Sequence, residues 1–122
     1  MAEHNETGKK AEKIAIAYLR GNGYTIKDTN WRYYKKEIDI VAEKDGKLII
    51  VEVKSRYERY FGDVSELITR KKMKNLVDAA EAYVIKKDLM MEVQFDYFVV
   101  IFGSYGEKTH HIQEAFIPGV NW

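Results

Sequence analysis

The amino-acid sequence predicts an α/β or α+β protein in which helices cover a mixed or antiparallel sheet. Two segments carry apolar residues at helical spacing, residues 7–20 and residues 66–87. Five further segments favour strands because they alternate in polarity or are rich in β-branched and aromatic residues: 24–34, 37–43, 47–54, 92–102 and 109–116. The predicted order is therefore a helix, three strands, a helix and two strands.

The first helix and the central hairpin have clear boundary signals. The apolar stripe of the helix is followed by Gly21-Asn22-Gly23, residues that tolerate the left-handed conformation in which many helices end. Asp45-Gly46 between residues 37–43 and 47–54 is a strong signal for a two-residue hairpin turn. Residues 55–64 are polar and aromatic, and we expect them to form a loop.

The second helix has two candidate starting points. Asp63 with Glu66 resembles a capping box, whereas Thr69 is a good N-cap by itself. Its stripe comprises Met73, Leu76, Val77, Ala80 and Val84.

Composition excludes several classes of protein. A chain of 122 residues predicts one domain, here residues 1–122, and 46% hydrophobic residues argue against intrinsic disorder. There is no cysteine, which excludes disulfides, a thiolate nucleophile and Cys-ligated metal sites. The apolar runs are too short to span a membrane and the N-terminus is polar, so we expect a soluble, cytoplasmic protein. A net charge of +1 excludes a protein that coats nucleic acid through a uniformly basic surface, although basic residues cluster between Lys54 and Lys74.

The central hairpin contains the candidate functional residues. If its turn is symmetric, Asp39 lies opposite Glu52 and Glu37 lies opposite Lys54, all on one face. Val41 and Ile50 flank the acids on that face. The other face is apolar and collects Ile38, Ile40, Ile49, Val51 and Val53.

Directly opposed carboxylates destabilise a hairpin unless something offsets their repulsion. A shared proton on one carboxyl would do so, and so would a bound Mg²⁺ or Mn²⁺. The alternative is an ordinary solvated face with a Glu37–Lys54 ion pair. Glu12 lies beside the apolar stripe of the first helix, where it either supplies a third carboxylate to the sheet or simply faces solvent.

An ordered set of motifs resembles the YraN-like family of predicted endonucleases and, within it, the PD-(D/E)xK nuclease motif. The blocks that carry the resemblance run from about residue 4 to residue 116: Gly8, Glu12, Tyr18-Leu19, Gly23-Tyr24, Asn30-Trp31-Arg32, Glu37-Ile38-Asp39, Val51-Glu52-Val53-Lys54, Phe61-Gly62, Lys72, Phe95-Asp96 and 111–116. The sequence departs from the family pattern at Ala11 and Lys36, where glycine is common, and at Ile38, which replaces the proline of the motif name.

The resemblance implies an α/β, restriction-endonuclease-like αβββαβ core with a mixed central sheet flanked by helices, similar to archaeal Holliday-junction resolvases. It implies Glu12, Asp39 and Glu52 as ligands of Mg²⁺ (or Mn²⁺). Asp39, Glu52 and Lys54 would be catalytic, with Lys54 positioning a water or stabilising the charge of the transition state. Glu37 would act as a partner of Lys54.

The function expected from the resemblance is a metal-dependent endonuclease that acts on branched or otherwise structured DNA, and junction recognition would suit a homodimer. A nucleic-acid-binding module without catalysis and a protein-interaction domain are the alternatives. Several residues are candidate nucleic-acid contacts: Arg32, Arg56, Arg59, Thr69, Arg70 and Lys72.

Other residues have predicted structural roles. The segment 56–61 mixes arginines with aromatic residues and either contacts nucleic acid or forms an aromatic mini-core that includes Phe61. We expect Asp96 to be structural, and His110 and His111 to be surface or capping residues.

Overall fold

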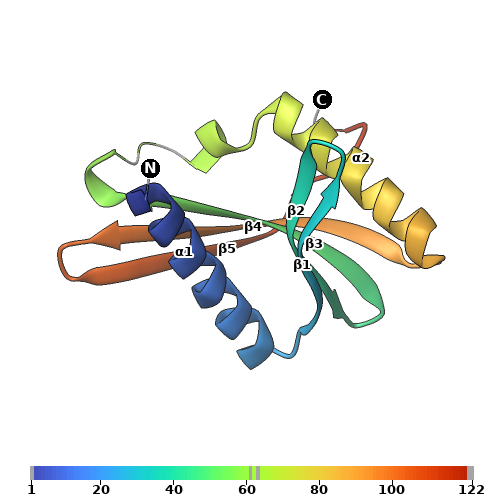
Figure 1. The fold of residues 1–122 in the computed structure, drawn as a ribbon, viewed down its shortest axis with the longest axis horizontal. Coiled ribbons are helices and arrows are strands. Elements are labelled where there is room, and N and C mark those ends of the chain that lie inside the picture. Colours follow the sequence, from blue (N-terminus) through green and yellow to red (C-terminus); the bar gives the residue numbers. More distant parts are fainter. Residues whose placement is uncertain (1, 61, 63, 121–122) are drawn as a thin grey trace.

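A computed structural model describes residues 2–60, 62 and 64–120 of the chain and gives the predicted α/β architecture (Figure 1). The helices and strands are α1 (Ala2–Gly21), β1 (Thr25–Tyr33), β2 (Lys36–Lys44), β3 (Lys47–Tyr57), α2 (Arg70–Lys87), β4 (Glu92–Gly103) and β5 (Gly106–Phe116). Two short 3-10 helices, η1 (Glu58–Tyr60) and η2 (Val64–Leu67), connect β3 to α2. The order from α1 to β4 is compatible with a restriction-endonuclease-like αβββαβ core, and β5 is added at the edge.

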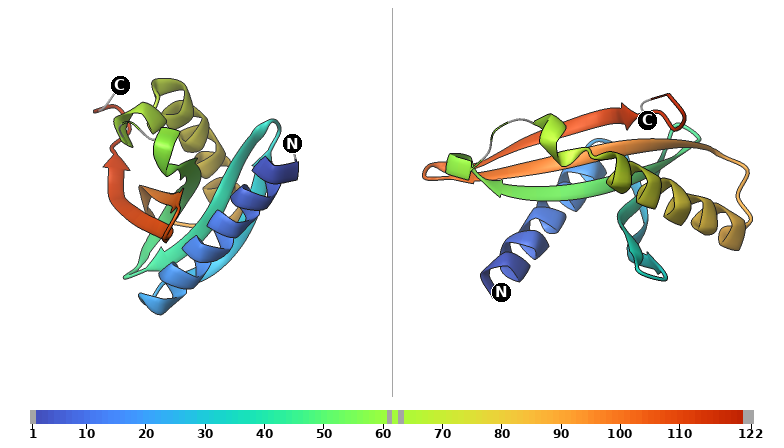
Figure 2. Two further views of the ribbon diagram at one scale, coloured as in Figure 1. Left: turned by 90° about the vertical axis from the view of Figure 1, so that its left-hand side faces the viewer. Right: turned by 90° about the horizontal axis from the view of Figure 1, so that it is seen from above.

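The five strands form one mixed sheet in the order β1-β2-β3-β4-β5. Strands β3 and β4 are parallel, which requires a crossover connection, and α2 lies in that connection; the other neighbours are antiparallel. The two helices cover opposite faces of this sheet (Figure 2). Ile40, Ile49 and Val51 pack with α1, whereas Val41 and Ile50 pack with α2, as the alternation of side chains along strands requires.

The β2–β3 hairpin has the predicted turn and register. Asp45 and Gly46 both have positive φ angles, 51° and 77°, as expected for a two-residue turn of type I′. The strands pair from Lys44–Lys47 to Ile40–Val51, so residues equally distant from the turn lie opposite each other.

Beyond this paired segment, β2 separates from β3 but remains paired with β1 as far as Tyr33–Lys36. The outer halves of β1 and β2 thus form a two-stranded ribbon that stands out from the rest of the sheet (Figure 2). Ile38 packs in the α2-side core, so its predicted position on the same face as Ile40 is wrong. Two-stranded ribbons twist more strongly than full sheets, which changes the face that a side chain presents.

Some element boundaries differ from the predictions. Helix α1 begins at Ala2 instead of residue 7. Strand β3 continues to Tyr57, through part of the predicted loop, because Ser55, Arg56 and Tyr57 pair with β4. Helix α2 begins at Arg70 with Thr69 as its N-cap.

Two sequence predictions fall on residues that the structure does not describe. Asp63 of the predicted capping box and Phe61 of the predicted aromatic mini-core both lie outside the described residues. Within the described part of the chain, no helix is both long enough and apolar enough to cross a membrane.

Candidate active site

The site is centred on Asp39, at the point where β2 and β3 separate. The backbone N–H of Val53 donates a hydrogen bond of 2.8 Å to Oδ2 of Asp39. In an uninterrupted antiparallel ladder, a backbone carbonyl of β2 would accept this bond. The carboxylate therefore replaces a backbone acceptor and lies between the two strands.

Glu52 of β3 lies next to Asp39, close enough for its carboxyl group to shift the pKa of Asp39. Glu52 is only 5% exposed. Burial raises the pKa of Asp39 to about 8, and hydrogen bonding with Glu52 and the charge of Glu52 act in the same direction. The backbone N–H of Val53 and the charge of Lys54 lower this pKa by smaller amounts. The two acids of the predicted pair thus lie side by side, just beyond the last paired residues of β2 and β3.

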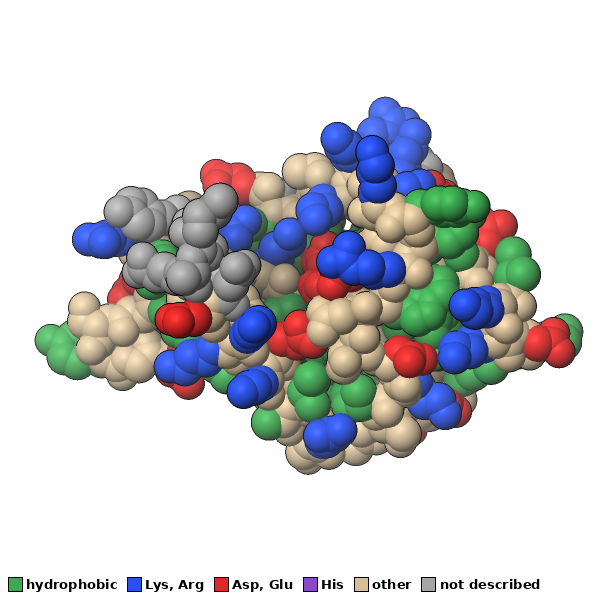
Figure 3. Space-filling view, viewed as in Figure 1, with side chains coloured by type: hydrophobic (Ala, Val, Ile, Leu, Met, Phe, Trp, Pro, Cys, Tyr) green, Lys and Arg blue, Asp and Glu red, His purple; other side chains and the backbone are tan. Residues whose placement is uncertain are grey.

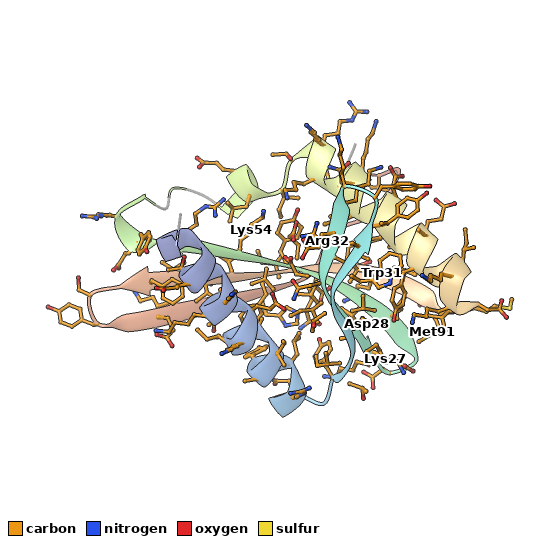
Figure 4. The ribbon with its side chains drawn as sticks, viewed as in Figure 1. Lys27, Asp28, Trp31, Arg32, Lys54 and Met91 are labelled. Carbon is orange, nitrogen blue, oxygen red and sulfur yellow. The ribbon has the colours of Figure 1, made fainter. Side chains whose placement is uncertain are left out.

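Two ammonium groups adjoin the pair. Nζ of Lys54 lies 4.0 Å and Nζ of Lys72 lies 3.5 Å from Oε2 of Glu52. Burial lowers the pKa of Lys54 despite the attraction of Glu52, and the charge of Lys72 lowers it further. Figure 4 shows Lys54 at the gap between α1 and α2, close to the ribbon that carries Arg32.

Two clefts adjoin the acid pair, and Asp39 lines both of them. A cleft of about 330 Å³ on the α2 side contains Asp39, Glu52, Lys54 and Lys72. A second cleft of about 260 Å³ on the α1 side contains Asp39 and Glu12. In Figure 3, acidic side chains lie in a hollow in the middle of the face, with lysine and arginine side chains around it.

Glu12 lies in the second cleft but does not join the acid pair. Its Oε1 accepts a hydrogen bond of 2.8 Å from Asn30, and burial raises its pKa, with a smaller contribution from the charge of Asp39. Among the described residues, no three acidic or histidine side chains lie close enough together to hold a metal ion. Of the three carboxylates expected as metal ligands, Asp39 and Glu52 therefore lie together, and Glu12 lies apart from them.

Comparison with known proteins assigns this chain to a family. The model of "Uncharacterised protein family UPF0102" matches residues 11–100, a segment that includes Glu12, Asp39, Glu52 and Lys54. This chain belongs to the UPF0102 family. The YraN-like resemblance inferred from the motifs is therefore confirmed.

Individual UPF0102 proteins match along nearly the whole chain. The UPF0102 protein of Christiangramia forsetii is 44% identical over 116 residues, which cover 95% of this chain and 98% of that protein. The UPF0102 protein of Phocaeicola vulgatus is 43% identical over 124 residues, which cover 98% and 99%. The UPF0102 protein of Bacteroides thetaiotaomicron is 44% identical over 118 residues, which cover 97% and 98%. These names state no reaction.

In this UPF0102 chain the donor set suits a hard divalent cation. Two carboxylates in contact are the oxygen ligands that Mg²⁺ and Mn²⁺ prefer, and a cation would relieve their repulsion. Tyr97 of β4 lies beside Glu52 of β3. Its fully buried hydroxyl has no hydrogen-bond partner within the described residues. Burial and then the charges of Glu52 and Asp39 raise the pKa of Tyr97. An orphaned hydroxyl beside an acid pair is consistent with a hydrated ion bound there.

Glu37 lies in the α2-side cleft, but its ion pair within the described structure is with Arg32, at 3.3 Å, and not with Lys54. Arg32 and Glu37 are directly opposed across the β1–β2 ribbon. The expected Glu37–Lys54 partnership fails because the ribbon separates from β3 before it reaches Glu37.

Of the other predicted nucleic-acid contacts, Lys72 alone lines the α2-side cleft. Oγ1 of Thr69 accepts a hydrogen bond of 3.2 Å from the backbone of Lys72, so Thr69 caps α2. Arg70 is exposed at the start of α2. Arg56 donates to the backbone of Ser55 at 2.7 Å, and Arg59 lines a separate hollow beside Phe102.

Three further residues that no sequence motif singled out as site residues also line the α2-side cleft: Lys35, Lys36 and Asn75. Asn75 follows Lys72 by three residues on α2, and helical spacing would have placed both on one face. Lys35 and Lys36 directly precede the Glu37 block.

A second buried acid has a different environment. Asp96 is fully buried on β4, and its carboxylate lies 2.7 Å from Nε2 of His111. Gln94 and the backbone N–H of Glu114 each donate a hydrogen bond of 3.0 Å to it. The structure supports the predicted structural role of Asp96, but the surface location expected for His111 is wrong.

Proposed function

We propose that this protein is a metal-dependent nuclease that hydrolyses phosphodiester bonds in structured DNA. The observation that carries the proposal is the pair of half-buried Asp39 and buried Glu52, which lines the α2-side cleft and has two lysines beside it. Asp39 also lines the α1-side cleft. A purely structural fold would not require two carboxylates in contact, because their repulsion and burial both destabilise the folded state.

Each residue has a definite role in this proposal. Asp39 and Glu52 hold the cation, and Glu12 is the carboxylate available in the second cleft to extend the set. A divalent cation supplies charge that polarises a phosphoryl oxygen and favours ionisation of water. Lys54 places its ammonium group beside Glu52, where it stabilises negative charge that develops on the phosphate.

Lys72 and the ribbon residues bind the substrate backbone. Lys72 is 47% exposed, and Lys35 and Lys36 line the same cleft. These cations attract a polyanion locally although the net charge of the chain is only +1. Local attraction favours contact at one site over uniform coating of DNA.

The decisive experiment is a cleavage panel of linear, flapped and four-way DNA with Mg²⁺ or Mn²⁺. We expect Asp39→Asn and Lys54→Ala to lower the cleavage rate at least about a hundredfold, since one removes a proposed ligand and the other a stabilising charge. Glu43→Gln, an acid on the same strand outside both clefts, is the matched control and should retain the wild-type rate. Equal cleavage by wild type and Asp39→Asn would contradict the proposal.

The incomplete ligand set favours one alternative, a nucleic-acid-binding module without turnover. That alternative predicts salt-dependent DNA binding and no cleavage with either metal. DNA binding that does not respond to salt, or no DNA binding at all, would instead favour a protein-interaction domain.

A further inference from the structure

The tip of the β1–β2 ribbon carries an exposed aromatic pair that the proposed chemistry does not use. Tyr33 ends β1 and pairs with Lys36, so Tyr34 and Lys35 are the two residues of the turn. Tyr34 is 86% exposed and Tyr33 is 37% exposed. Their rings meet edge to face, with centroids 4.7 Å apart and planes at 71°.

The backbone at this tip is unfavourable for tyrosine. Tyr34 has a φ angle of 55°, in the left-handed region that favours glycine at the first position of a two-residue hairpin turn. A bulky residue in this conformation costs about 1 kcal/mol or more. Glycine at this position would avoid the conformational cost, and the exposed ring of Tyr34 gains little stability from packing.

The ribbon tip is held in place at the edge of the α2-side cleft. Nζ of Lys36 donates a hydrogen bond of 2.6 Å to Asp78 of α2, and Arg32 and Glu37 form an ion pair across the ribbon. Lys35, next to Tyr34, lines the cleft together with Asp39 and Glu52. In Figure 1 the tip lies beside α2, and in Figure 2 the ribbon projects from the sheet.

Aromatic rings and cations together on one protrusion suit nucleic acid better than protein. A base stacked on an exposed aromatic ring contributes about 1–3 kcal/mol, and adjacent lysine or arginine binds the phosphates on either side. Duplex bases are already stacked on each other, so only unpaired bases offer a free face to a projecting ring.

We infer that the Tyr33–Tyr34 tip, which we call the aromatic tip, stacks on an unpaired base of the substrate next to the candidate active site. This inference rests on the proposed function and specifies its substrate class, DNA with single-stranded bases beside a duplex. The stacked base orients the flanking strand across Lys35 into the cleft that contains Asp39.

The test measures binding in the presence of EDTA, so that cleavage does not contribute. The probes are a flapped duplex with 2-aminopurine in the flap and a blunt duplex of the same sequence. Tyr34→Gly removes the ring and relieves the backbone strain, so the variant should fold at least as well as wild type. Tyr105→Gly is the matched control, because Tyr105 is a fully exposed tyrosine in the β4–β5 turn and lines neither of these two clefts.

We expect Tyr34→Gly to weaken binding of the flapped probe by about 5- to 150-fold, as the loss of one stacked base implies. It should also abolish the change in 2-aminopurine fluorescence and leave binding of the blunt duplex within about twofold. Unchanged binding of the flapped probe, or an equal loss on both probes, would overturn the inference. An equal loss in Tyr105→Gly would overturn it as well.

The outcomes separate this inference from the proposed function. If Tyr34→Gly keeps the wild-type preference for the flap while Asp39→Asn abolishes cleavage, the stacking inference is wrong and the nuclease proposal stands. If Tyr34→Gly loses that preference but wild type cleaves no substrate, the stacking inference stands and the nuclease proposal is wrong.

Discussion

Two aspartates on the strands that flank β3 have opposite environments. Asp96 on β4 is fully buried, with two hydrogen-bond donors and the ring of His111 around it. Asp39 on β2 has one backbone donor, a carboxyl group as its neighbour and two clefts beside it. A carboxylate with its partners supplied is a structural element, whereas one placed against another acid is available for a ligand.

The physical difference lies in the balance of burial and partners. Burial of a carboxylate is unfavourable unless hydrogen bonds or opposite charges replace water. Asp96 obtains them from β4 itself and from β5. Asp39 is placed where the sheet splits, and its neighbour Glu52 adds repulsion. We therefore expect substitutions at the two positions to have opposite effects on stability.

The largest expected effect on stability comes from Asp96→Ala. The variant removes the shared acceptor of the buried His111 ring, the Gln94 amide and the backbone N–H of Glu114, so the free energy of unfolding should fall by about 3–5 kcal/mol. Urea unfolding measures it. Asp78→Ala, which removes an exposed acid paired with Lys36, should change the free energy of unfolding by no more than about 1 kcal/mol. A similar small loss for Asp96→Ala would remove the contrast between the two sites.

The next effect is stabilisation by a divalent cation. Mg²⁺ or Mn²⁺ at a hundred times its dissociation constant should raise the free energy of unfolding by about 2.7 kcal/mol. At a fixed metal concentration the gain should be larger at pH 8.5 than at pH 6, because a proton on Asp39, with its pKa of about 8, competes with the metal. Thermal unfolding with titrated metal measures this. An equal shift in Asp39→Asn would show that the ion binds elsewhere.

A smaller effect of opposite sign to that of Asp96→Ala is expected for Asp39→Asn in metal-free buffer. The folded-state pKa of Asp39, about 8, lies above its ordinary value of 3.8, so the folded protein retains a proton that the unfolded chain releases. This contribution to stability is complete below about pH 4 and is lost as the pH rises to about 8. Asparagine does not ionise, and the variant should be more stable than wild type by about 2 kcal/mol at pH 8.5.

The difference between Asp39→Asn and wild type should shrink as the pH falls toward 4. Urea unfolding across this range measures it, and Asp78→Asn, at an exposed position, should show no such dependence. A variant less stable than wild type at pH 8.5 would mean that Asp39 is a structural acid like Asp96.

Much of the candidate site was predictable because its signals are local. The Asp45-Gly46 turn fixes the pairing of β2 with β3, and alternation then brings Asp39 and Glu52 to the same end of the hairpin. The family motifs singled out Lys54 and Lys72 without any knowledge of the fold. The identity of the acids and lysines follows from these short-range patterns.

Other features could not be read from the chain because they depend on distant partners. Strand β3 extends to Tyr57 only because β4 lies beside it, and the same pairing brings Tyr97 next to Glu52. His111 is buried because β5 places it against Asp96, 15 residues earlier in the chain. Glu37 does not pair with Lys54, because at Glu37 strand β2 is paired with β1 and no longer with β3.

The sequence by itself determined the order of elements, the hairpin turn, the register of its paired segment and the residue types of the site, since periodicity and turn chemistry act over a few residues. The tertiary structure alone decided where β2 and β3 separate. That separation leaves the N–H of Val53 to the Asp39 carboxylate and opens a cleft on each side. It is a tertiary property because β2 is shared between two neighbours, and beyond Ile40 its pairing with β1 prevails over its pairing with β3.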